Sequence, residues 1–171
     1  MDWFVVFPDL VILVEAKSTR LSHLARMGGE KLKADLDRCI GVAYTQVTRS
    51  HKLIEKHPAF KSIPNDRRRV ALVVTMEPYW NANAADLEGF LDKPEIPTMV
   101  VSIGTLEHLV GVLAQLGGPE VLMDIMDDGE RRTWELESAL PKIEVPDNSI
   151  LEEAWMRFPF ANWGEKFVHE E

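Results

Sequence analysis

The chain has 171 residues, of which 46% are hydrophobic and 27% are charged, which is the composition of a soluble globular protein. It has no run of about 20 apolar residues and no basic leader segment, so we expect neither a transmembrane helix nor a signal peptide. The single cysteine, Cys39, can form neither an internal disulfide nor a cysteine-based zinc site. A reducing, cytoplasmic location is therefore expected.

The net charge of −9 is unevenly distributed along the chain. Residues 1–70 contain 13 Lys or Arg and 8 Asp or Glu, whereas residues 119–171 contain 5 and 14. A basic excess in one half favours a polyanionic partner such as nucleic acid, although a merely solvated surface pattern would have the same composition.

The first predicted element is a β-hairpin. Residues 2–7 and 10–16 are β-branched and aromatic runs, and Pro8-Asp9 between them suits a tight turn. The second run is apolar almost throughout, so we expect a central strand that is buried on both faces.

The elements after the hairpin alternate between helices and strands. The first is a helix over 30–56, which Gly41 weakens and Pro58 ends. A strand over 70–76, a short helix over 84–92 and a strand over 98–102 follow. The last is a helix that Thr105 caps at its start and Gly117-Gly118 ends. This order predicts an α/β domain with a mixed sheet over residues 1–118. Residues 119–171 are expected to form an acidic helical extension packed on that core, with short helices near 119–127 and 149–157.

Two charged residues end the apolar second strand. Glu15 and Lys17 are two positions apart, so their side chains point to the same face. With Pro8-Asp9 as the turn, Asp2 lies opposite Glu15, and their Cβ atoms are about 5 Å apart. Burying such charges costs several kcal/mol unless they are paired or hold a ligand.

A hard divalent cation would relieve the repulsion between the two carboxylates. Oxygen-rich sites suit Mg²⁺ or Mn²⁺, and the backbone carbonyl of Ala16 is well placed as a further ligand. Lys17 could then orient or deprotonate the attacking water, or neutralise charge that develops on a phosphate. The alternative is a surface hairpin in which Glu15 and Lys17 form a cross-strand or solvated pair.

The pattern D-x-x-V-V-x-P-x-x-V-x-x-V-E-x-K from Asp2 to Lys17 resembles the hairpin of the PD-(D/E)xK nuclease superfamily. It is most similar to nuclease-related domains and to Holliday-resolvase-like and restriction-endonuclease-like folds. The resemblance implies that Asp2 and Glu15 are metal ligands, with Asp9 as the backup for Asp2, and that Lys17 is the catalytic lysine. It also implies a role for a polar residue on the following helix, for which Gln46 is the candidate.

The resemblance covers roughly residues 1–77 and implies a restriction-endonuclease-like core that lacks its usual first helix and strand. That unit would precede Asp2 in a longer reading frame, or a partner chain would supply it. A homodimer is the other assembly that we consider. The implied activity is Mg²⁺-dependent cleavage of DNA, endo- or exonucleolytic, of a defence or repair type. A catalytically inactive nuclease-fold module that binds nucleic acid or a protein is the alternative.

Several basic residues are candidates for contacts with the phosphate backbone. They are Arg20, Lys31, Lys33, Arg67, Arg68 and Arg69. Other chemistries lack their motifs, because the chain has no Gly-rich phosphate loop, no G-x-S-x-G and no H-E-x-x-H.

Overall fold

A computed structural model describes the chain except for residues 21, 23–28, 80–81, 85–90 and 158–171. Its centre is a sheet of four strands in the order β1-β2-β3-β4. The strands are β1 (Trp3–Val6), β2 (Leu10–Lys17), β3 (Arg68–Thr75) and β4 (Thr98–Ser102). β1 is antiparallel to β2, whereas β2, β3 and β4 run parallel, so the sheet is mixed as predicted.

The predicted hairpin register is confirmed. Trp3 is the partner of Val14, and the Phe7 N–H donates to the Leu10 carbonyl at 2.8 Å across the Pro8-Asp9 turn. Residues 10–15 of β2 are all buried, as expected for a central strand. The register matters for function because it sets which residues meet at the far end of the hairpin.

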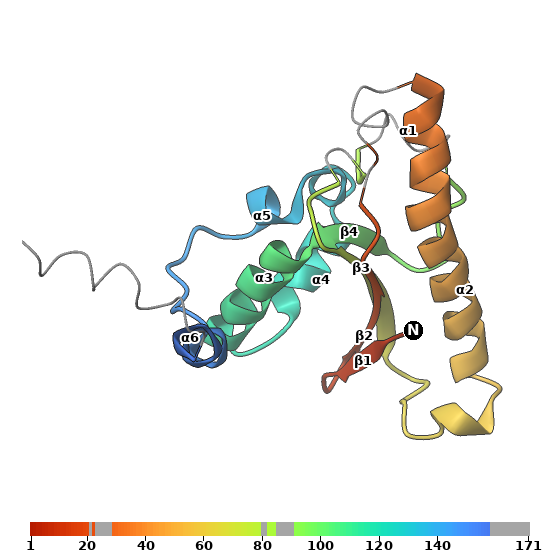
Figure 1. Cartoon of the computed structure of the whole chain (residues 1–171). Coiled ribbons are helices and arrows are strands. Elements are labelled where there is room, and N and C mark those ends of the chain that lie inside the picture. Colours follow the sequence, from red (N-terminus) through yellow and green to blue (C-terminus); the bar gives the residue numbers. More distant parts are fainter. Residues whose placement is uncertain (21, 23–28, 80–81, 85–90, 158–171) are drawn as a thin grey trace, which may run out of the picture.

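One face of the sheet is covered by a long helical run (Figure 1). It comprises α1 (Gly29–Leu36), a π-helical turn (Asp37–Gly41) and α2 (Val42–Ile54). The predicted 30–56 helix is therefore present, and its weak point at Gly41 is the end of the π turn. Odd-numbered residues of β2 such as Val11 and Leu13 pack on this face.

The opposite face is covered by α3 (Ile103–Leu116), α4 (Glu120–Asp127) and α5 (Leu136–Ala139) (Figure 1). Leu122, Ile125 and Leu136 belong to the same core as the strand residues Ile12 and Leu72. The first part of the acidic extension thus contributes to the core of the sheet. Short 3₁₀ turns lie at Pro58–Phe60 and Arg131–Thr133, and a last helix, α6, spans Ser149–Met156.

Two expectations need comment. The N-cap of α3 is Ser102 and not Thr105, because the Ser102 hydroxyl accepts the Thr105 N–H at 3.1 Å and β4 leads directly into the helix. Most of the predicted 84–92 helix lies outside the described residues. Within the part of the chain that the structure describes, no helix is long and apolar enough to cross a membrane.

Gly117 offers a stability test of the end of α3. Its φ of +79° lies in the left-handed region, which disfavours any side chain. We expect Gly117→Ala to lower the free energy of unfolding by about 1 kcal/mol, measured by urea titration. Gly104→Ala is the matched control. The added methyl meets only the Ser102 hydroxyl, at 3.9 Å, inside the same helix, so it should raise stability by about 0.5–1 kcal/mol. Equal effects of the two substitutions would contradict this explanation.

Candidate active site

Glu15 and Lys17 lie at the end of β2, on the face that α2 covers. Glu15 is only 3% exposed, and the Lys17 side chain is 16% exposed. The Lys17 Nζ donates to Glu15 Oε1 at 2.8 Å and to Gln46 Oε1 of α2 at 2.5 Å. The lysine thus compensates a buried carboxylate and is fixed in turn by a helix residue far away in the sequence.

Asp2 immediately precedes β1 and lies beside the end of β2. Its Oδ2 accepts the Ala16 N–H at 2.7 Å, and the side chain is exposed. In a strand the N–H and C=O of one residue point to the same side, so the Ala16 carbonyl also faces β1. Asp2, Glu15 and Ala16 therefore bring oxygen atoms to one end of the hairpin.

The second carboxylate oxygen of Glu15 has an unusual environment. Glu15 Oε2 is buried and accepts no hydrogen bond within the described residues. The charged group nearest to it is the Met1 amino group, at 3.3 Å. Two ammonium groups, those of Met1 and Lys17, therefore compensate the buried carboxylate, and a divalent cation at Oε2 would take the place of the Met1 amino group.

These donors fit a hard divalent cation. Carboxylate and carbonyl oxygens are the ligands of Mg²⁺ and Mn²⁺, and Mg²⁺ usually keeps several waters beside one or two carboxylates. Among the residues that the structure describes, no group of three or more His, Cys, Asp or Glu side chains could hold a metal. A cation here would therefore depend on Asp2, Glu15, the Ala16 carbonyl, and water or substrate.

Tyr79 positions the chain just after the site, and the sequence alone did not identify it. Its hydroxyl donates to the Thr19 carbonyl at 2.7 Å, two residues beyond Lys17. Burial raises the pKa of the Tyr79 hydroxyl, so it stays protonated as a donor at neutral pH. Nothing local in the sequence links residues 60 positions apart, which explains why pattern analysis could not find this contact.

The three consecutive arginines do not join this site. Arg68 and Arg69 pair with Leu10 and Val11 at the start of β2, four to seven residues from Glu15 and Lys17, or about 13–23 Å along the strand. Arg68 also forms a bidentate salt bridge with Asp127, at 2.5 and 2.6 Å.

The other two arginines of the run are also engaged within the chain. Arg67 donates to the Phe7 carbonyl. Arg69 is buried and donates to Glu55 at 3.2 Å and to the Asn65 side chain at 3.0 Å. The run therefore stabilises the start of β3, and its charge does not reach the end of the sheet where Glu15 lies.

The other predicted basic residues follow β2 in the chain. Arg20 follows Lys17 by three residues, is exposed, and pairs with Glu77 at 3.3 Å. Lys31 and Lys33 are exposed on α1, which follows the loop after β2 (Figure 1). All three side chains are exposed to solvent.

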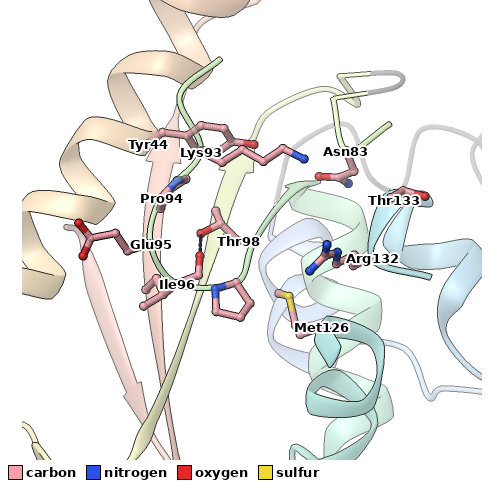
Figure 2. Close-up of a pocket in the computed structure, with 11 residues that line it drawn as sticks. Tyr44, Asn83, Lys93, Pro94, Glu95, Ile96, Thr98, Met126, Arg132 and Thr133 are labelled. Atoms are coloured by element: carbon pink, nitrogen blue, oxygen red, sulfur yellow. Dashed lines mark hydrogen bonds between the residues drawn. The ribbon is translucent and has the colours of Figure 1, made fainter. Parts of the chain in front are cut away.

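A separate polar pocket of about 230 Å³ lies beside β4 (Figure 2). Lys93 and Arg132 approach it from opposite sides, while the Glu95 carboxylate is turned away toward Lys52, at 2.6 Å. The Asn83 side chain at its wall accepts from the Val100 N–H at 2.8 Å and donates to the Val100 carbonyl at 2.9 Å. It thus makes the two hydrogen bonds that the backbone of an adjacent strand would otherwise make. The pocket contains none of the predicted site residues.

No protein-family model matches the chain. No curated protein matches it closely enough to identify a relative. The residues of the site itself are therefore the basis for assigning a function.

Proposed function

We propose that the chain is a metal-dependent nuclease of the PD-(D/E)xK type that cleaves DNA. The observation that carries the proposal is the Lys17 ammonium, held between Glu15 and Gln46 at the end of a buried strand, with Asp2 across the hairpin. A lysine held beside a carboxylate can orient or deprotonate a water that a divalent cation activates for phosphodiester cleavage.

Each residue then has a definite task. Asp2, Glu15 and the Ala16 carbonyl would hold Mg²⁺ or Mn²⁺, which supplies Lewis acidity to the scissile phosphate. Lys17 keeps one N–H beyond those donated to Glu15 and Gln46, and would donate it to the attacking water or to the phosphate oxygen that gains charge. Gln46 restrains Lys17, so that the ammonium is oriented before the substrate arrives.

The approach of the substrate follows from where the bases lie. Arg20, Lys31 and Lys33 would contact backbone phosphates on the exposed side of the strand end. Arg67, Arg68 and Arg69 are left out of this surface because their guanidinium groups are engaged elsewhere.

One observation favours a second function. Among the described residues, no third His, Cys, Asp or Glu side chain joins Asp2 and Glu15 in a metal-binding group, which leaves a small ligand set for a catalytic metal. A catalytically inactive module that binds nucleic acid through Arg20, Lys31 and Lys33 would have the same fold and needs no third ligand.

Cleavage of end-labelled DNA distinguishes these functions. We expect the purified chain to cut duplex or single-stranded DNA in about 5 mM Mg²⁺ or Mn²⁺, a concentration that is ample for a site of this class. EDTA should abolish the activity. RNA of the same sequence serves as the comparison substrate. Salt-sensitive binding of DNA without cleavage in either metal would favour the inactive module instead.

A further inference from the structure

β1 is an edge strand of the sheet, and one side of its backbone is open (Figure 1). In an antiparallel pair, every second residue directs its N–H and C=O toward the partner strand. The Phe7 N–H donates to β2, so Val5, two positions earlier, faces β2 as well. The N–H and C=O groups of Phe4 and Val6 therefore point away from the sheet. Among the described residues, none makes a hydrogen bond to the backbone of either.

The side chains of β1 do not protect this edge. Exposed edge strands of native proteins usually carry a charge, a proline or a bulge that prevents pairing with other molecules. The four residues of β1 include no charge and no proline. Trp3, Val5 and Val6 are 59%, 43% and 44% exposed. The strand thus offers both open hydrogen-bonding groups and apolar surface to another strand.

The opposite edge of the sheet, β4, is already covered at its centre. The Asn83 side chain makes both hydrogen bonds of the Val100 backbone there. Of the two edges in the described structure, β1 is thus the one that can pair with another strand. Two copies that meet through β1 have no second open edge, so they close as a dimer and do not extend into a filament.

We infer that β1 pairs with β1 of a second copy, antiparallel and about a two-fold axis, and that this joins the two four-stranded sheets into one. The pairing is independent of the proposed nuclease activity, because no residue of β1 belongs to the candidate active site. A second copy is the occupant because the edge is complementary to itself, in its backbone groups and in its side chains.

The backbone groups select one register for the pair. Outward-facing residues must meet, so Phe4 and Val6 of one copy pair with the same two residues of the other. A register with Phe4 opposite Phe4 would need the Asp2 N–H, which is already donated to Val14. A register with Val6 opposite Val6 would need Pro8, which has no N–H. Phe4 opposite Val6 leaves no N–H or C=O of either residue unpaired.

This register brings only apolar side chains together. Val5 meets Val5 of the second copy on the axis, and Trp3 of the second copy is opposite Phe7. Phe7 lines an open apolar groove of about 450 Å³ between the hairpin and α3. The groove has Val110, which is 58% exposed, at its far wall. Trp3 of the second copy therefore covers the open side of this groove.

The area of the contact fits a weak dimer. An aromatic side chain buries about 150–250 Å². Two copies of Trp3, the groove walls that they cover and the paired strands together approach the about 1,200 Å² at which standard interfaces begin. We therefore expect a dissociation constant of about 1–100 µM.

Charge substitutions at Val5 test the axis, with sedimentation equilibrium of the full chain as the measurement. Val5→Lys places two ammonium groups opposite each other, and Val5→Glu does the same with carboxylates. Each should weaken dimerisation at least about 10-fold. An equal mixture of the two variants should form a heterodimer, because opposite charges then meet across the axis. Val42→Lys is the matched control: Val42 is 49% exposed on α2, and its substitution should leave dimerisation unchanged.

Amide hydrogen exchange tests the edge itself. The Phe4 and Val6 amides should be protected well above the dissociation constant and should exchange freely after dilution. The Val5 amide, which faces β2, should be protected at both concentrations. A wild-type monomer, a dimer that persists in Val5→Lys, or a mixture of Val5→Lys and Val5→Glu that stays monomeric would each overturn the inference. Protection of Phe4 and Val6 that dilution does not change would mean that the same chain covers the edge, and would also overturn it.

Discussion

Lys17→Ala is expected to lower the rate of metal-dependent DNA cleavage by about 10²–10⁴-fold. Lys17 is the only lysine of the described chain whose ammonium contacts both Glu15 and Gln46, so no neighbour can replace it at the strand end. The rate should be measured under single-turnover conditions with saturating metal, so that chemistry and not product release is compared.

This substitution also affects folding, because it leaves the buried Glu15 carboxylate without its nearest side-chain partner. We expect a loss of about 1–3 kcal/mol in the free energy of unfolding, which urea titration will show. Assays therefore belong at a temperature at which the variant is fully folded. Lys52→Ala is the matched control: Lys52 is 56% exposed, pairs with Glu95 on the surface, and should be dispensable for cleavage. If Lys17→Ala cleaves as fast as Lys52→Ala, Lys17 has no catalytic role.

Much of the hairpin could be predicted because its rules are local. Pro8-Asp9 sets the turn, the turn sets the register, and the two-residue period of a strand places Glu15 and Lys17 on one face. The same period could not say which helix would cover that face. The contact between Lys17 and Gln46 joins residues 29 positions apart, and the resemblance rather than the pattern pointed to Gln46.

The arginine run shows where the sequence was insufficient. Composition identifies a basic segment, but a strand of eight residues has two ends about 23 Å apart, and only the sheet pairing assigns the arginines to one of them. Their partners are equally non-local, since Asp127 is 59 residues from Arg68. The charge distribution therefore favours a polyanionic partner for the first half of the chain. It does not indicate which basic side chains could contact that partner.

The affinity for Mn²⁺, measured by calorimetry, should also change strongly when a proposed ligand is substituted. We expect Glu15→Gln to weaken binding at least about 10–100-fold, because the substitution keeps the shape of the side chain and removes the charge of its buried oxygen. Asp2→Asn should weaken binding to a similar degree at little cost in stability. Asp2 is exposed, and the amide oxygen of Asn can still accept the Ala16 N–H.

Asp9→Asn separates the two candidate aspartates. Asp9 is exposed in the turn at the far end of the hairpin, so its carboxylate should be irrelevant to a cation beside Glu15. Loss of Mn²⁺ binding in Asp9→Asn, with normal binding in Asp2→Asn, would transfer the ligand role to the turn and would contradict the register argument. If the wild-type chain binds no Mn²⁺ at millimolar concentrations, the buried Glu15 oxygen serves only to compensate nearby cations. The fold is then better explained as a module that binds nucleic acid without cutting it.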